Sequence, residues 1–265
     1  MSEAIHVVTI FNFEPEPRYQ ALMTMFLDRV LLHGAERITI LYEQHRPQLD
    51  GRFARHSKIE LRQGRRVDVG HPHHNLSFKL PNLAAIDEPF LFLDADMAVL
   101  ADLHPLWALR NDKPWIGVDH TWVVSDPRTH REPFLNSGLQ LVGDPDFYDL
   151  QKILAVQEAA APLRLGHRIP KDVMFACPGT DQAVLFRYFR HLGYDYTHPA
   201  VGPAWNCCAA EVELSHDGAD WHGRLRGNTD IEAKIVHYWN PFKPWAINCP
   251  LYASYLRAYS VSEGS

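Results

Sequence analysis

"PFLFLDADMAVL", residues 89–100, is the stretch that decides the fold of this chain. Its first half is a continuous apolar run, which is typical of a strand buried on both faces of a sheet. Asp94 and Asp96 follow that run directly. In an extended chain, residues two apart point to the same face, so both carboxylates are expected to reach one ligand.

The sequence before this stretch alternates strands and helices. Apolar, β-branched runs predict strands at residues 5–13, 37–44 and 59–64. Residues 18–36 show helical spacing of apolar side chains, and Gly34 is placed to end that helix. A strand, a helix and a second strand in this order are the building block of a parallel α/β sheet.

After this stretch, predicted strands and helices continue as far as residue 193, where Gly193 is placed to end a helix. Residues 195–230 show no clear period and are predicted to be rich in loops. Further strands are expected at residues 114–124, 134–143 and 233–239, and helices at 77–86, 145–161, 180–193 and 250–259.

The composition is that of one globular domain. The 265 residues are 46% hydrophobic and 11% aromatic, and the net charge of −6 offers no general attraction to nucleic acid or to an anionic membrane. The four cysteines show no CxxC spacing, which favours a reduced, cytoplasmic protein over a disulfide framework. No run of about eighteen apolar residues is present, so no transmembrane segment is expected.

The acidic pair lies where α/β proteins bind ligands. Ligands of open α/β sheets collect at the carboxyl ends of strands, and Asp94 and Asp96 follow such an end. Two adjacent carboxylates suit a divalent cation that also carries phosphate. The alternative is that one aspartate caps the following turn while the other is solvated.

Further motifs follow a definite order along the chain. They are "FKL" (78–80), "FLNSGLQLV" (134–142), "GTDQAVL" (179–185), "AWNC" (204–207) and "HYWNPFKPW" (237–245). With the acidic pair, this order resembles the glycogenin-type retaining glycosyltransferases, which include bacterial lipopolysaccharide galactosyl- and glucosyltransferases. The last motif is the most specific, since that family ends in H-aromatic-x-G-x-x-K-P-W.

The resemblance implies a GT-A fold: a single Rossmann-like α/β domain over residues 1–265, with a mostly parallel central sheet flanked by helices. Its nucleotide-binding half would be about 1–100, its acceptor-side half about 101–245, and a C-terminal helix would follow at 250–260. It also implies a nucleotide-sugar donor, usually a UDP-sugar, and Mn²⁺ or Mg²⁺. The acceptor stays open between a glycan, a lipid-linked sugar and another hydroxyl, and so does the oligomeric state.

The resemblance also implies roles for individual residues. Asp94, Asp96 and His237 would bind the metal ion, while Asp181 and Gln182 would lie beside the reacting sugar carbon. The residues expected to contact the donor are Phe11, Asn12, Lys79, Asn136, Ser137, Gly138, Asn240 and Lys243.

One position departs from the family pattern. Asn240 replaces the family's glycine and is followed by Pro241. Asparagine tolerates a positive φ better than most residues, so the turn can form, but proline removes a backbone donor that would face the phosphates.

The chemistry of these residue types agrees with sugar transfer. A divalent metal and the Lys243 ammonium would stabilise a leaving diphosphate. An imidazole ligand favours Mn²⁺ over Mg²⁺, which prefers oxygen. Two alternatives remain: His237 as a hydrogen-bonded structural residue, and Asp181 as a helix N-terminal charge favoured by the macrodipole.

Retention of configuration allows two routes. A side chain, Asp181 or Gln182, attacks the sugar first, or the acceptor attacks from the face that the diphosphate leaves; the poor nucleophilicity of Gln182 favours the second.

Two other functions compete with transfer. A sugar-phosphate nucleotidyltransferase should carry a glycine-rich basic loop after its first strand, and "FNFEPEPR" (11–18) is not one. A donor-binding scaffold without turnover is the remaining alternative.

Overall fold

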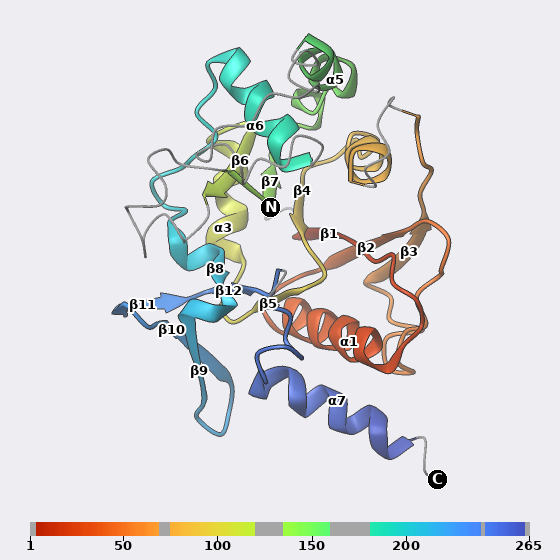
Figure 1. Cartoon of the computed structure of the whole chain (residues 1–265), viewed down its shortest axis with the longest axis vertical. Helices are drawn as coiled ribbons and strands as arrows, with labels where there is room; N and C mark the ends of the chain where they lie inside the picture. Colours follow the sequence, from red (N-terminus) through yellow and green to blue (C-terminus); the bar gives the residue numbers. More distant parts are fainter. Residues whose placement is uncertain (1–3, 69–74, 120–134, 160–180, 240–241, 263–265) are drawn as a thin grey trace, which may run out of the picture.

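The computed structural model describes residues 4–68, 75–119, 135–159, 181–239 and 242–262 (Figure 1). Its centre is a six-stranded sheet with the order β3-β2-β1-β4-β7-β6. The pairs among β3, β2, β1 and β4 are parallel, whereas β7 is antiparallel to both β4 and β6. The expected mostly parallel α/β sheet is confirmed. These strands are β1 His6–Ile10, β2 Arg37–Tyr42, β3 Ile59–Gln63, β4 Phe90–Leu93, β6 Trp115–Asp119 and β7 Leu135–Val142.

Helices cover both faces of this sheet. On β4, Leu91 and Leu93 pack with α1 side chains, while Phe90 and Phe92 pack with α6 side chains on the opposite face. The four residues are buried, as the continuous apolar run predicts. The helices are α1 Pro17–Leu32, α2 Leu80–Leu83, which continues the π-helical turn η1 Asn75–Lys79, α3 His104–Ala108, α5 Leu150–Ala159, α6 Asp181–Leu192 and α7 Pro250–Ser262.

Two glycines end helices as expected. Gly34 follows α1 with a φ of 106°, and Gly193 follows α6 with a φ of 62°. Only glycine adopts such values without a penalty from a Cβ atom, so both positions stop a helix.

The stretch 89–100 forms two strands rather than one. The chain leaves the central sheet after β4 and enters β5 Met97–Val99, which belongs to a separate three-stranded sheet of order β5-β12-β8. A turn closed by a 3.1 Å hydrogen bond from Met97 N to Asp94 O separates them. The expectation that Asp94 and Asp96 share one face of an extended strand is therefore wrong, because the polar residues break the strand. The partners of β5 are β8 Cys207–Cys208 and β12 Ile235–His237.

The prediction of loops over residues 195–230 is confirmed as far as residue 211, where irregular chain and 3-10 turns surround the two-residue β8, and it is wrong for residues 212–230. This region contains β9 Val212–His216 and β10 Trp221–Leu225, which pair antiparallel with each other, and β11 Asn228–Ala233 pairs with β10. Charged and polar residues alternate with apolar ones along these short strands because one face of the sheet is exposed. The alternation spans too few residues to stand out from loop sequence.

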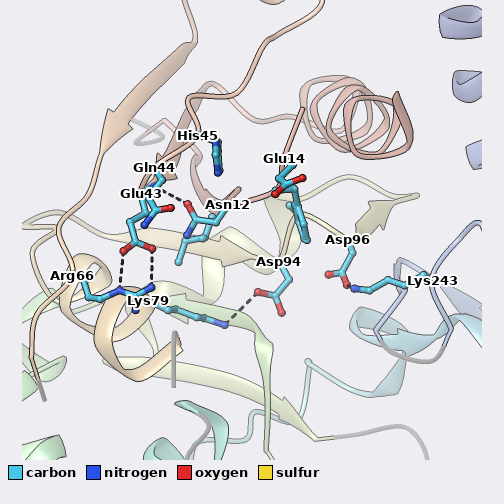
Figure 2. A pocket seen from close by; sticks show the side chains of 13 residues that line it. Asn12, Glu14, Glu43, Gln44, His45, Arg66, Lys79, Asp94, Asp96 and Lys243 are labelled. Carbon is cyan, nitrogen blue, oxygen red and sulfur yellow. Dashed lines mark hydrogen bonds and ion pairs between the residues drawn. The ribbon is translucent and has the colours of Figure 1, made fainter. Parts of the chain in front are cut away.

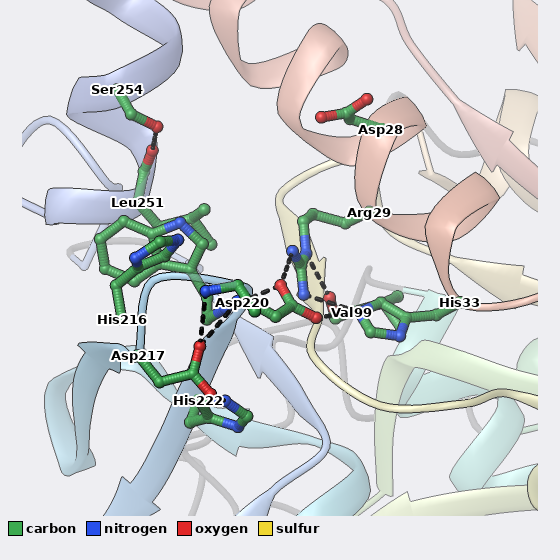
Figure 3. A network of polar contacts seen from close by, with 12 residues as sticks. Asp28, Arg29, His33, Val99, His216, Asp217, Asp220, His222, Leu251 and Ser254 are labelled. Atoms are coloured by element: carbon green, nitrogen blue, oxygen red, sulfur yellow. Dashed lines mark hydrogen bonds and ion pairs between the residues drawn. The ribbon is translucent and has the colours of Figure 1, made fainter.

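A buried arginine ties this added sheet to α1 and β5 (Figure 3). Arg29, which is 3% exposed, donates from Nε to Val99 O at 2.8 Å and forms an ion pair with Asp220 of the β9–β10 turn. Its Nη2 lies 2.6 Å from His33 Nε2. Three segments distant in sequence are thus joined around one guanidinium.

The buried His6 and the partly buried His33 make stability depend on pH. Burial, then Arg37 for His6 and Arg29 for His33, lowers the pKa of each from 6.5 to about 4. The unfolded chain binds these protons below pH 6.5 and the folded chain does not, so stability is full above pH 6.5 and falls toward pH 4. Each shift corresponds to about 3 kcal/mol. Urea unfolding at several pH values from 7 to 4.5 measures how the free energy of unfolding falls. In His33→Gln, about half of this fall should disappear. A fall as steep as in the wild type would contradict the role of His33.

Two sequence expectations concerned membrane-spanning segments and the cysteines. Among the described residues, no helix combines the length and the hydrophobicity needed to cross a membrane. Within the described part of the chain, Cys207, Cys208 and Cys249 are buried and form no disulfide bond.

Candidate active site

The acidic turn is fixed by the strand next to it. Asp94 continues the β4–β7 ladder for one residue, since its backbone N donates to Gly138 O at 2.8 Å. Three residues later the chain starts β5, and Asp96 stands at this change of sheet. The turn therefore holds both carboxylates at the carboxyl end of β4, where ligands of α/β sheets bind.

Strand pairing brings His237 to this turn. Residue His237 of β12 stands opposite Met97 of β5, and Tyr238 N donates to Asp96 O at 2.9 Å. His237 Nε2 lies 3.4 Å from Asp96 Oδ1 and 3.7 Å from Asp94 Oδ2. The donor atoms of these three residues lie within 4.8 Å of one another, as three ligands of a single ion would.

Two lysines hold the outer oxygens of the same carboxylates. Lys79 Nζ lies 3.3 Å from Asp94 Oδ1, and Lys243 Nζ contacts Asp96 Oδ2 (Figure 2). The other oxygen of each aspartate faces His237. Each carboxylate thus keeps one oxygen toward the imidazole, which is a suitable arrangement for one bond from each to a shared cation.

The charges of this cluster are strongly coupled. Burial raises the pKa of Asp96, but His237 and Lys243 lower it by more, so its pKa lies well below the usual range. Burial raises the pKa of Asp94 above its usual value, and Asp96 adds to this against the effect of Lys79. A divalent cation between the two aspartates would offset both the burial and the repulsion.

Gly138 has no side chain, and this leaves room beside it for the His237 ring and the Asp94 carboxylate. A Cβ atom on Gly138 would lie 2.3 Å from His237 Cε1 and 2.8 Å from Asp94 Oδ2. No real Cβ makes contacts this short, so only glycine allows the imidazole and the carboxylate to converge here. The residues present therefore fit a divalent metal ion in both chemistry and shape.

A second group of site residues surrounds Lys79. Its Nζ lies 2.9 Å from Asp181 Oδ2 and donates to Ser137 O at 3.0 Å. Burial lowers the pKa of Lys79, but Asp181 and Asp94 raise it by more, so its pKa lies above the usual value. Gln182 Oε1 accepts from Ser137 N at 3.2 Å. The start of α6 is thereby linked to the acidic turn.

Asn136 belongs to the same group, since its Oδ1 accepts from Gly138 N at 2.8 Å. The "FLNSGLQLV" and "GTDQAVL" motifs are thus brought together with the acidic pair.

An open pocket of about 560 Å³ lies beside these groups, a size typical of small-molecule sites. Lys79, Asp94, Asp96 and Lys243 line one end of it (Figure 2). The remaining lining residues come from the ends of β1 and β2 and from the segment after β3: Ile10, Asn12, Phe13, Glu14, Glu43, Gln44, His45, Arg66 and, beside the acids, Ala95.

Polar contacts organise the far end of this pocket. Asn12 Oδ1 accepts from Glu43 N at 2.6 Å. Arg66 donates to both oxygens of Glu43, at 2.8 and 3.1 Å. Sequence reasoning missed Glu43 and Arg66, although the position of Glu43 just after a parallel strand was a usable signal.

Two of the expected donor residues stand apart. Phe11 is buried in the core and lines a smaller neighbouring pocket of about 250 Å³ rather than the larger one. Asn240 lies outside the described residues.

Comparisons with known proteins agree with this architecture. No protein-family model and no curated protein sequence matches the chain. Among solved structures, the galactosyltransferase LgtC in complex with donor and acceptor sugar analogs matches with a TM-score of 0.62 at 17% identity. The match covers 97% of this chain and 96% of that one. The chain has the GT-A glycosyltransferase fold.

Other glycosyltransferase structures share this fold over longer chains. The glycosyltransferase GlyE of Streptococcus pneumoniae TIGR4 matches 98% of this chain with 64% of its own, at 12% identity and a TM-score of 0.55. The bifunctional glycosyltransferase WbbM matches 98% of this chain with 50% of its own, at 14% identity and a TM-score of 0.51. The resemblance noted from the motifs is confirmed at the level of fold.

Proposed function

We propose that this chain is a metal-dependent glycosyltransferase that moves a hexose from a nucleotide sugar, a UDP-sugar, to a hydroxyl acceptor with retention of configuration. One observation carries the proposal: Asp94, Asp96 and His237 converge at one end of a pocket in a glycosyltransferase fold. Lys79 and Lys243 line the same end. This set of charges suits a metal-bound diphosphate.

The metal ligands in this proposal are Asp94 Oδ2, Asp96 Oδ1 and His237 Nε2, the three atoms that face one another. When bound, Mn²⁺ or Mg²⁺ supplies positive charge to the donor's diphosphate. Lys243 adds an ammonium at the same end of the pocket, and exchanges Asp96 for a phosphate oxygen as the donor enters.

The far end of the pocket would take the nucleoside. Asn12, Glu43 and Arg66 offer both hydrogen-bond donors and acceptors there, and Phe13 provides an aromatic ring. The metal ligands lie at the opposite end, so a nucleoside diphosphate would span the pocket between them.

The surroundings of Asp181 favour the same-face route for transfer. Asp181 is 1% exposed and is paired with Lys79, which stabilises the carboxylate as an anion and reduces its nucleophilicity. In the proposed step the acceptor oxygen bonds to the sugar carbon while the bond from that carbon to the diphosphate breaks. The acceptor's proton passes to a diphosphate oxygen, and Asp181 orients the donor.

Thermal unfolding with uridine diphosphate tests the proposal. Ligand binding to the folded state alone adds about 2.7 kcal/mol at a hundredfold excess over Kd, which raises the melting temperature by several degrees. We expect this increase with Mn²⁺ present and little without it. Asp96→Asn should abolish the metal-dependent part, while Asp102→Asn, a substitution at an exposed aspartate, should retain it.

A wild-type protein without any metal-dependent increase would refute the proposal. Slow hydrolysis of one nucleotide sugar from a panel then distinguishes an enzyme from a donor-binding scaffold and identifies the sugar.

A further inference from the structure

Asn206 lies directly behind the histidine of the metal cluster. It precedes β8, which pairs with β12 so that Cys208 stands beside His237. The Asn206 side chain is fully buried, and its Oδ1 lies 3.1 Å from His237 Nδ1. The opposite ring nitrogen, Nε2, faces the two aspartates.

We infer that Asn206 is a positioning residue that fixes the tautomer of His237. In this arrangement the Nδ1–H of His237 donates to Asn206 Oδ1, and Nε2 carries the lone pair. The inference rests on the proposed function, in which His237 binds the metal ion through Nε2. An imidazole binds a metal ion only through an unprotonated nitrogen, so this role requires the proton to be on Nδ1.

The distances around Nε2 support this tautomer over the other. An Nε2–H would be expected to approach a carboxylate oxygen at about 2.7 to 3.2 Å. The observed separations are 3.4 Å to Asp96 and 3.7 Å to Asp94, longer than such a bond. Nε2 and the two oxygens therefore surround a common point, as three ligands of one cation would.

The other half of the Asn206 amide points to the same conclusion. Its Nδ2 is buried and has no hydrogen-bond partner among the described residues. Leaving a buried donor unsatisfied is unfavourable. Of the two polar atoms of this amide, Oδ1 is the one with a described partner, His237 Nδ1.

Nitrogen NMR of histidine-labelled full-length protein tests the tautomer directly. The chain has 16 histidines, so the His237 signals are assigned by their loss in His237→Gln. Without metal, we expect the wild-type ring to carry its proton on Nδ1. A proton on Nε2 of the neutral ring would overturn the inference. This measurement needs no metal and is independent of whether the chain transfers sugar.

Two substitutions at Asn206 extend the test to metal binding. Asn206→Leu removes the acceptor at similar volume and should weaken Mn²⁺ binding, titrated without nucleotide, by about 10 to 100-fold. It should also shift the His237 proton to Nε2. Asn206→Asp retains an acceptor oxygen and should bind Mn²⁺ within about threefold of wild type or more tightly. Asn111→Leu, at an exposed asparagine, is the matched control.

The variants also show which idea has failed. Equal loss of Mn²⁺ affinity in Asn206→Leu and Asn206→Asp, with both folded, would overturn the inference. So would an unchanged tautomer in Asn206→Leu. If wild type binds no Mn²⁺ at all, the proposed function fails, while the NMR result still decides the role of Asn206.

Discussion

Replacing Lys79 with methionine is expected to lower the free energy of unfolding by about 3–5 kcal/mol, because it leaves buried carboxylates without their cation. Lys79 is 4% exposed and its ammonium contacts both Asp181 and Asp94. It also lies over the ring of Phe92 at 4.2 Å from the centroid. Methionine has a similar length and keeps the aliphatic packing, so the loss reports the charge. Urea denaturation at pH 7 measures it.

A double substitution separates the ion pair from packing. Lys79→Met combined with Asp181→Asn removes the anion that the lysine balances, so the pair should cost less than the single lysine variant. Lys152→Met provides the control, because Lys152 is 71% exposed and its ion pair with Asp149 contributes little. A loss below about 1 kcal/mol in Lys79→Met would mean that the buried charges are compensated elsewhere.

Replacing Gly138 with alanine is expected to weaken Mn²⁺ binding by about 100-fold or more, since it displaces two of the proposed metal ligands. The new methyl group would overlap His237 Cε1 at 2.3 Å and crowd Asp94 Oδ2 at 2.8 Å. His237 has little room to yield, since it is 3% exposed and its other side contacts Asn206. Overpacking should also lower stability by about 1–3 kcal/mol. A Mn²⁺ titration followed by electron paramagnetic resonance gives the affinity, and urea unfolding gives the stability.

Gly51→Ala is the matched control for this experiment, because nothing lies within 4 Å of a Cβ atom at that position. The control should leave both affinity and stability near wild type. Wild-type Mn²⁺ affinity in Gly138→Ala would show that His237 and Asp94 do not bind the ion in the observed arrangement.

Much of the central sheet could be predicted because its strands are buried on both faces. The apolar runs at 5–13, 37–44 and 89–93 became β1, β2 and β4, since a short, continuously hydrophobic segment is typical of a strand in the middle of a covered sheet. The β9–β11 sheet could not be predicted in this way. Its strands are half exposed, and the chain resembles a polar loop until the burial of Leu225 and Ala233 is known.

Part of the candidate site could be predicted because it adjoins a strongly predicted strand. Asp94 and Asp96 stand next to a strong strand signal, so their location followed from the pattern. Glu43 and Arg66 belong to different segments, and their pairing across the pocket depends on how the β2 and β3 strands end. Asn206 was visible within a motif, but its contact with His237 requires the pairing of β8 with β12.

The residue types of the site and the strand that leads into it can be identified from the amino-acid sequence. Local hydrophobicity fixes where a buried strand runs, and the order of short motifs carries the resemblance to glycosyltransferases. Which of these residues come into contact depends on the folded arrangement of the strands. Lys243 and Asp96 are 147 positions apart, and the pairing of β12 with β5 brings the end of β12, six residues before Lys243, next to the acidic residues. Contacts between distant segments depend on strand pairing and on space, such as that left by Gly138, and neither is encoded within a single stretch of sequence.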